Sequence, residues 1–597
     1  MPHLDELHAN LQAKLDKQIV DPCYVEVIID PDGVNIDISS YVKRGTALTI
    51  SKKKSIRPYS KLGSYSVSEV NITCNNIADF FNHNVKGKTF YHATTRLFQD
   101  ASSANSYFDV PAGDGDKLVS GDSVFITDLS TGTTVEKTID SIDTTTYTYY
   151  DRIATTAALG TDFDAGARAE TLYLVGKEVI VKSYFDDTAQ KVNQFAGVLA
   201  ALPKLNNTEA RLTIVDNFSK LLNIDITANS YKTLIDSLGT YSDNLIITRA
   251  EDPASEGLFN LDEVTINTGY CKIGDWKIEF IDESQNYTVT DPDGIEYTGG
   301  TLGDFTVGTS PTHQLIIADG CWGASNDYDK GDIIEFKTTC AMGLGVNTYN
   351  SVPQMLYRLL IEDFGAGLDT GDLATTPWAD IIDQFEACRG AITFTKATTV
   401  LKAIETLQAH INASVFHNND GEISIAAYRP QLESGSEYTL SPNADISELD
   451  QEDLGRIQRI RLNYNYTQEG GYQNKQILPD GAFQVGTFME LNYPAYHTSD
   501  RPQTRSSGSR IFRMWERGLK AYEIQEKWNT GIAFDINETY KISSNHPALA
   551  ERLVEIYEIK KDINNKTVTF SAYDRDFVFG NYAFTEVDYT DRGKVTW

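Results

Sequence analysis

Short runs in which apolar and polar residues alternate recur along most of the 597-residue chain. Residues 34–38 (VNIDI) show this pattern, and they follow a turn-forming stretch at residues 30–33 (DPDG). Alternation with a period of two places the apolar side chains on one face of a strand, so each run predicts a half-buried β-strand. The recurrence of such runs therefore predicts a mainly β fold.

The first half of the chain has two groups of such runs on either side of a stretch with a different composition. The expected strands lie at residues 23–30, 34–38, 47–54, 65–76, 178–185, 192–202 and 210–216. Together they predict an antiparallel sheet or small barrel that begins with a hairpin. The stretch between the two groups is rich in Ser, Thr, Asp and Gly, and we expect it to form a small inserted β-domain.

Helical periodicity in the second half predicts α+β parts. Residues 351–365, with Ser351 as N-cap, and residues 398–411 carry apolar side chains at spacings of three and four, which is typical of helices that face a core. A hairpin around Asn-Asp-Gly should follow at residues 413–428. A long helix is expected over residues 510–530, after an exposed loop at residues 497–509.

One hydrophobic core cannot serve a chain of this length, because domains usually span about 100–200 residues. We also expect an amphipathic helix over residues 4–15, where leucines recur at helical spacing. The expected domains are residues 1–96 with 175–250 (an interrupted β-barrel), 97–174 (an inserted β-domain), 251–345 (a second inserted, β-sandwich-like domain), 346–450 (an α+β domain) and 451–597 (a C-terminal α+β domain).

The chain is strongly acidic, with 84 Asp and Glu against 52 Lys and Arg and a formal net charge of -32. Binding to nucleic-acid phosphates is unfavourable for such a chain. The same charge suits a surface past which DNA slides without adhering. No apolar run of about 18 residues predicts a membrane span, and the first residues lack the pattern of a secretory signal. We therefore expect folding in a cytoplasm, with six reduced and buried cysteines.

Patterns of catalytic or cofactor-binding residues are not evident. Residues 87–89 (GKT) resemble the end of a phosphate-binding loop, but Asn82 stands where that motif requires Gly. The nine histidines show no metal-ligand spacing. The acidic turns at residues 291–294 and 327–332 lack the spacing of an EF-hand calcium loop, so plain β-turns are favoured. We expect no catalytic residue, no cofactor and no metal site.

A basic cluster stands out in this acidic chain. It contains Lys43, Arg44, Lys52, Lys53, Lys54, Arg57 and Lys61. One interpretation is a solvated strand edge, because lysines on edge strands prevent unwanted pairing. The other is a contact with an acidic neighbouring subunit, for which the first six of these residues are the candidates.

Two tryptophans of the second inserted domain, Trp276 and Trp322, are candidate glycan-contact residues, since flat apolar rings suit the faces of sugars. Packing in the core of a β-sandwich is the favoured interpretation, because aromatic residues of strands usually point inward.

Six segments, in this order, resemble hub proteins of bacteriophage tail tips and baseplates. They are VNIDISSYVKRGTALTISKKKS (residues 34–55), YSVSEVNITCNNIADFF (65–81), VNQFAGVLAALPKLNNTEARLTIVDNFSKLL (192–222), TTVLKAIETLQAHINASVFHNNDGEISI (398–425), ETYKISSNHP (538–547) and KTVTFSAYDRD (566–576). They are spread along most of the chain outside the two inserted domains.

The resemblance implies a hub with tail-tube-like β-barrel domains. It also implies a homotrimer, whose six barrels match the sixfold tube. The implied partners are a distal tail or tail-tube protein and a tape-measure protein on one side, and tail fibres or a spike on the other. Some members carry a C-terminal peptidoglycan-cleaving domain. This sequence ends at Trp597, soon after the last similar segment, so we expect no such activity.

The expected function is that of a non-enzymatic virion component. It would close the distal end of the tail tube at the tail tip or baseplate and let DNA pass through its lumen during ejection. The alternative is a carbohydrate-binding adhesin for host-cell attachment, in which the inserted β-domains recognise a surface glycan. A glycan-cleaving enzyme is a third class, since carboxylates are too numerous for a catalytic pair to be chosen or excluded.

Overall fold

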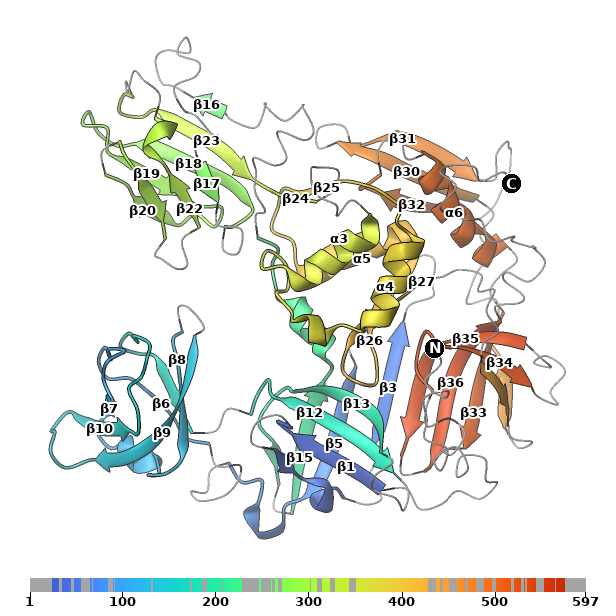
Figure 1. The fold of residues 1–597 in the computed structure, drawn as a ribbon, viewed down its shortest axis with the longest axis horizontal. Helices are drawn as coiled ribbons and strands as arrows, with labels where there is room; N and C mark the ends of the chain where they lie inside the picture. The colour runs from blue at the N-terminus through green and yellow to red at the C-terminus, as the bar shows by residue number, and fades with distance from the viewer. Residues whose placement is uncertain are drawn as a thin grey trace.

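The computed structural model of the protein is mainly β with α+β parts, which confirms the predicted fold class (Figure 1). It describes residues 24–574 except 32–34, 44–47, 55–64, 67, 84–89, 91, 130–132, 172–173, 185–190, 207, 228–245, 249–258, 260–263, 267–270, 301, 309–313, 323–327, 343–350, 428–435, 441–443, 450–458, 468–470, 479–487, 497–500, 517–519, 528–530, 532–533, 544–551 and 564. The helix expected over residues 4–15 lies outside the described residues.

A curled seven-stranded sheet contains the strands expected on either side of the first insert, except the one expected at residues 47–54, which lies in another sheet. Its strands are β1 Tyr24–Ile29, β2 Ile36–Asp37, β5 Glu69–Asn75, β12 Glu178–Tyr184, β13 Val192–Leu199, β14 Lys204–Leu205 and β15 Glu209–Val215. The order is β14-β15-β13-β12-β1-β2, and β5 pairs with β15. The predicted hairpin forms, with Ile29 opposite Ile36. Gly197 permits the close approach of β13 to β15, because a Cβ there would lie 2.3 Å from the Val215 carbonyl oxygen.

An eight-stranded sheet combines strands from both ends of the chain. Its strands are β3 Thr49–Lys54, β4 Tyr65–Ser66, β28 Ser436–Thr439, β29 Asp445–Glu448, β33 Ala521–Lys527, β34 Thr539–Ser543, β35 Arg552–Asp562 and β36 Thr567–Asp574. The order is β28-β34-β35-β36-β33-β29. The long strand β35 also pairs with β3, which brings a strand from the first tenth of the sequence beside the last strands (Figure 1).

The first insert folds as a sheet with its own core, which stands apart from the main body in Figure 1. Its strands are β6 Thr94–Arg96, β7 Tyr107–Pro111, β8 Ser123–Thr127, β9 Thr134–Asp143, β10 Tyr150–Thr155 and β11 Arg168–Glu170, in the order β6-β11-β8-β9-β10-β7. Its two ends meet, because the Thr171 N–H donates to the Ala93 carbonyl over 3.0 Å.

The second insert contains two sheets, and its first strand, β16, lies just before the expected boundary at residue 251. The five-stranded sheet has the order β16-β23-β18-β19-β20 and the three-stranded sheet the order β17-β22-β21. The strands are β16 Ile246–Thr248, β17 Val264–Ile266, β18 Gly274–Phe280, β19 Tyr287–Thr290, β20 Glu296–Thr298, β21 Phe305–Val307, β22 Leu315–Ile317 and β23 Ile333–Thr338. Tyr287 and Phe305, one from each sheet, meet edge to face with ring centroids 5.7 Å apart.

Helices fill the space between these sheets. The elements are α3 Val352–Ile361, α4 Thr375–Gln384, α5 Val400–Ile411, the hairpin β26 Ala413–His417 with β27 Ile423–Ala427, and the pair β24 Cys340–Met342 with β25 Ile392–Phe394. The 3-10 helices are η2 Ser39–Tyr41, η3 Ile77–Asp79, η4 Gly115–Lys117, η5 Asn217–Leu222, η8 Asp319–Cys321 and η9 Thr370–Asp372. As predicted, Ser351 begins α3, in a capping box with Gln354.

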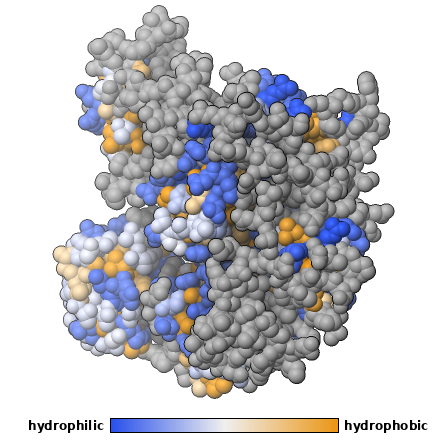
Figure 2. Space-filling model, turned by 45° about the vertical axis from the view of Figure 1, so that its right-hand side comes forward, coloured by the Kyte–Doolittle hydropathy of each residue, from blue (hydrophilic) through white to orange (hydrophobic). Residues whose placement is uncertain are grey.

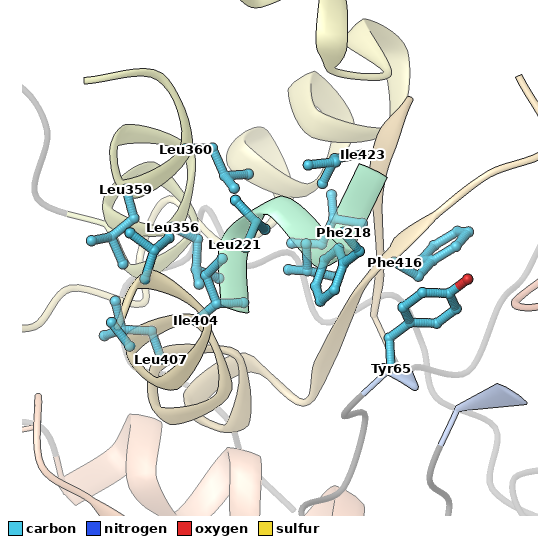
Figure 3. Close-up of a cluster of buried hydrophobic side chains, with 14 of the residues drawn as sticks. Tyr65, Phe218, Leu221, Leu356, Leu359, Leu360, Ile404, Leu407, Phe416 and Ile423 are labelled. Carbon is cyan, nitrogen blue, oxygen red and sulfur yellow. The ribbon is translucent and has the colours of Figure 1, made fainter. Parts of the chain in front are cut away.

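The helices join the seven-stranded sheet through a shared hydrophobic cluster (Figure 3). Phe218 and Leu221 of η5, which directly follows β15, point toward α3, α5 and β26. Leu356 and Leu407 supply part of the opposing surface, and all four side chains are almost completely buried. Burial of such side chains contributes roughly 1.5–3 kcal/mol each, so this cluster fixes the helices against the sheet.

The last part of the chain corrects two predictions. Residues 501–516 form helix α6 (Arg501–Glu516), where a loop was expected up to residue 509. Thr504 and Ser507 are buried, and a Cβ at Gly508 would lie 2.4 Å from Leu462 Cδ2. The helix thus packs through small residues against the three-stranded sheet β31-β30-β32. The strands of this sheet are β30 Arg459–Thr467, β31 Gly471–Leu478 and β32 Phe488–Tyr493.

The expected helix over residues 510–530 is wrong beyond residue 516, because β33 occupies residues 521–527. Tyr522, Ile524 and Glu526 are buried while Glu523 and Gln525 are exposed, which is the period of a strand. Among the described residues, no helix combines the length and apolar character needed to cross a membrane.

Candidate functional site

Lys52 lies at the centre of a buried polar cluster where the two large sheets meet. Strand β3 alternates, so Ile50 and Lys52 face inward and Lys53 faces out. The Lys52 ammonium lies 3.0 and 3.2 Å from the two carboxylate oxygens of Asp535. It also donates to Asn419 Oδ1, over 2.8 Å, and to the backbone carbonyl of residue 417. The side chain is 1% exposed, so this ion pair belongs to the interior.

A second buried lysine, Lys561 of β35, faces the same side of the sheet. Its residue pairs with Ile50 of β3 in the strand register, and its ammonium donates to Gln194 Oε1 of β13 over 3.2 Å. Burial lowers the pKa of Lys561 to about 8, against the opposing attraction of Asp535. Lys561 therefore connects the C-terminal sheet to the seven-stranded sheet.

Asp216 completes the cluster at the end of β15. It occupies the N-cap position of η5, and its carboxylate accepts hydrogen bonds from the Ser68 N–H (2.6 Å) and the Tyr65 hydroxyl (2.9 Å). Burial raises the pKa of Asp216 to about 6, although these hydrogen bonds and Lys52 favour its ionised form. The carboxylate thus ties β15 to the segment that follows β4.

These groups form a polar seam, which we define as Lys52, Gln194, Asp216, Asn419, Asp535 and Lys561. All six residues are buried, and they come from segments up to 509 positions apart in the sequence. Buried charges are costly unless they are paired. The seam therefore stabilises one relative placement of the two sheets and the β26–β27 hairpin, and dissolved substrates cannot reach its side chains.

The structure separates the members of the basic cluster. Lys52 was expected to contact a neighbouring subunit, but this expectation is wrong because the side chain is buried within the chain. Lys43 pairs with Glu209, and both side chains are partly exposed. Lys53, which is 55% exposed, pairs with Glu558 over 2.6 Å. The side chains of Arg44, Lys54, Arg57 and Lys61 lie outside the described residues.

Trp276 and Trp322 both lie in the core of the second insert, as the packing interpretation expected. The Trp276 indole N–H donates to Thr338 Oγ1 over 2.9 Å, and the Trp322 indole N–H donates to the Gly303 carbonyl over 3.0 Å. Neither ring face is available to a ligand on the surface.

The acidic stretch at residues 291–294 forms a turn. The Asp291 carboxylate accepts hydrogen bonds from the backbone N–H groups of Asp293 and Ile295, both over 2.9 Å, and pairs with Lys272. In the described parts of the chain, no three His, Cys, Asp or Glu side chains are grouped so that they could hold a metal ion.

Sequence reasoning missed Asp216, Asp535 and Lys561 as members of a cluster. For the lysines a signal existed, since Lys52 and Lys561 occupy inward positions of alternating strands, where an apolar residue is the rule. Asp535 follows no such pattern, and only the tertiary structure brings it to Lys52.

A search of protein-family models and a search of curated proteins found no match to this chain. Among solved structures, a 43 kDa tail protein of prophage MuSo2 from Shewanella oneidensis matches at 8% identity, over 93% of this chain and 99% of that one, with a TM-score of 0.37. A prophage tail protein from Listeria monocytogenes matches at 7% identity, over 92% and 94%, with a TM-score of 0.34.

A virion of a native gene transfer agent also matches, at 8% identity over 55% of this chain and 74% of the matched one, with a TM-score of 0.29. These solved structures are what the chain is similar to in fold. They come from prophage tails and a virion.

Proposed function

We propose that the protein is a structural subunit of a bacteriophage tail, a hub of the tail tip or baseplate that closes the distal end of the tail tube. The observation that carries this proposal is the placement of the six hub-like segments. They supply β2, β3 and β5, then β13, β15 and η5, then α5 with the β26–β27 hairpin, and finally β34 and β36. All of these elements belong to the two large sheets or to the helices and the hairpin that pack against them.

If the similarity were due to chance, hub-like segments should occur in the two inserts as well as in the main body. Alternating strands are equally common in the two inserts, yet no hub-like segment falls there. The inserts form sheets of their own, and in Figure 1 they lie to one side of the body that the hub-like segments build. An assembly core with two added surface domains explains both facts.

The proposed hub acts through shape and contacts. Three copies would form a ring, with a tail-tube or distal tail protein and the tape-measure protein above it and fibres or a spike below. The net charge of -32 suits a lumen for DNA, because like charges repel the phosphate backbone at close range. The polar seam keeps the two large sheets of each subunit in a fixed relation, which a closed ring requires.

The test is electron microscopy of the purified full-length chain and of tail particles that contain it, together with sedimentation analysis. We expect a threefold ring with a central channel and a mass of about three chains. A chain that is monomeric both in solution and in the virion would contradict the proposal.

The same experiment can test whether the basic cluster contacts a neighbouring subunit, if the charge of one of its exposed members is reversed. Lys53→Glu should weaken the ring if that surface meets an acidic neighbour. Lys277→Glu is the matched control, because Lys277 is also a partly exposed strand lysine paired with a Glu, in the second insert. Equal assembly of both variants would show that Lys53 does not lie in the subunit interface. Electron microscopy would still test whether the ring forms.

A further inference from the structure

The outer face of the first insert carries a cluster of aromatic side chains around one arginine. Strands β7 and β10 pair with Asp109 opposite Arg152. Phe108 and Ile153 point into the core of this domain, so alternation places Tyr107, Asp109 and Arg152 on the outer face. Figure 2 shows this domain at the lower left, where hydrophobic residues are interspersed with hydrophilic ones.

Arg152 is held rigidly on this face. Its Nε and Nη2 donate to the two carboxylate oxygens of Asp109, over 2.8 and 3.0 Å. Gln99 Nε2 donates to the same carboxylate over 2.6 Å. The guanidinium carbon lies 3.9 Å from the ring centroid of Tyr107 and 4.7 Å from that of Tyr147. The bidentate pair with Asp109 neutralises the positive charge of Arg152 and fixes the guanidinium beside the rings of Tyr107 and Tyr147.

Further rings extend the cluster into solvent. Tyr150 stacks on Tyr147 at a centroid distance of 4.5 Å and on Phe98 at 5.6 Å. Phe98 is 45% exposed, and the neighbouring Tyr149 is 76% exposed. We name Phe98, Tyr107, Tyr147, Tyr149 and Tyr150 the aromatic patch. A contiguous group of exposed rings rimmed by polar groups is typical of an interaction surface.

The loop between β9 and β10, which carries Tyr147 and Tyr149, is ordered before any ligand arrives. The Asp143 carboxylate accepts hydrogen bonds from the backbone N–H groups of Thr145 and Thr146, each over 3.0 Å. Hydrogen bonds from Thr146 and Thr145 lower the pKa of Asp143 to about 2, so the acceptor stays ionised at neutral pH. Arg152 Nη1 also donates to the Tyr147 hydroxyl over 3.1 Å. A preordered loop lowers the entropy lost on binding.

We infer that the aromatic patch is a binding site for neutral saccharides. A sugar ring offers an apolar face for stacking and hydroxyls at its rim, which match exposed aromatic rings beside Gln99, Arg152 and tyrosine hydroxyls. The Arg152–Asp109 pair leaves no net charge for an anion. A nucleic acid also stacks on aromatic rings, but its phosphates would meet a chain of net charge -32.

This inference does not depend on the proposed hub. The patch lies in a domain with a separate hydrophobic core, on other elements than the polar seam and the basic cluster. The subunit ring can therefore fail to assemble while saccharide binding persists, and saccharide binding can fail while the subunit ring assembles.

The test is saturation-transfer NMR with the full-length chain and neutral pentasaccharides of glucose, galactose and N-acetylglucosamine. At least one pentasaccharide should bind, and its ring protons should receive magnetisation. Tyr149→Ala and Phe98→Ala should each weaken binding by roughly threefold to tenfold, since one stacked ring is lost. Both side chains are exposed, so neither variant removes core packing.

Tyr466→Ala is the matched control, because Tyr466 of β30 is 47% exposed and lies outside the first insert. It should leave binding unchanged. The inference would be overturned by no binding of any pentasaccharide, by equal binding by wild type and both patch variants, or by binding confined to an acidic polymer such as polygalacturonate. A tail protein that binds the patch while every neutral saccharide fails would likewise overturn it and assign the patch to a protein partner.

Discussion

Lys52 and Lys53 are neighbours in sequence and have opposite environments. Both follow from one strand, in which successive side chains point to opposite faces. Lys52 meets Asp535 in the interior, whereas Lys53 meets Glu558 at the surface. Because desolvation makes a buried charge dependent on its partner, identical substitutions at these two positions should have very different effects.

We expect Lys52→Met to lower the free energy of unfolding by about 3–5 kcal/mol, since it leaves the Asp535 carboxylate buried without its ion pair. Lys53→Met should change it by no more than about 1 kcal/mol. Native-state hydrogen exchange of the β35 amides measures both. Lys52→Met combined with Asp535→Asn should recover part of the loss, and similar exchange rates in the two single variants would contradict the role given to the seam.

Asp216 should make stability depend on pH. Its pKa rises from 3.8 to about 6 on folding, so between these values the folded state holds a proton that the unfolded state has lost. Its contribution to stability is therefore fully present below pH 3.8 and is lost as the pH rises through 6. Asp216→Asn removes this effect, and the variant should gain on the wild type by up to about 3 kcal/mol between pH 4 and 7.

Calorimetric melting temperatures across this pH range provide the measurement. His410→Gln serves as a comparison with the opposite sign, because burial lowers the pKa of His410 to about 4. The stability that His410 contributes is present above pH 6.5 and is lost as the pH falls toward 4. If the difference between wild type and Asp216→Asn does not vary with pH, Asp216 does not titrate in the folded protein as described.

At the scale of elements, periodicity predicted correctly which helices and strands form, but not always where they begin and end. The β1–β2 hairpin, α3, α5 and the β26–β27 hairpin all lie where alternation or helical spacing predicted them. The helix predicted at residues 510–530 is wrong beyond residue 516, where β33 follows. The start of α6 was missed because small side chains hold it against Leu462, and their spacing carries no hydrophobic signal. Its true partner surface is formed by β30, which local sequence cannot identify.

The six-stranded sheet of the first insert should be removable as a unit. Ala93 and Thr171 are hydrogen-bonded at its base, with Ala93 N–H donating to Thr171 Oγ1 over 2.9 Å. A variant in which two glycines replace residues 94–170 should fold, keep the melting temperature of the main body within a few degrees and form the same oligomer. It should bind no saccharide through the aromatic patch.

Sedimentation and calorimetry measure these properties of the excised variant. A deletion of residues 134–155 alone is the control, because it removes β9 and β10 and exposes the core of that sheet, so it should aggregate. Misfolding of the clean excision would show that the main body depends on the insert, and the domain boundaries predicted at residues 97–174 would need revision.

At the scale of the whole molecule, the main result is that a strand near the beginning of the chain pairs with a strand near its end. Strand β3 pairs with β35, and the Lys53–Glu558 ion pair joins residues 505 positions apart. Residues 47–54 were assigned by sequence to the first domain, but their strand completes the C-terminal sheet. The eight-stranded sheet therefore depends on both ends of the chain, a relation that a linear list of domains does not express.

The sequence by itself determined the mainly β class, most strand positions, the turns and the helix caps, because these depend on local periodicity and on residues within a few positions of one another. Only the tertiary structure decided which strands pair, that Lys52 and Lys561 are interior, that Trp276 and Trp322 are core residues, and that aromatic rings gather around Arg152 of β10. The reason is physical: pairing and burial follow from long-range packing free energy, to which local sequence contributes only one of the two surfaces in contact.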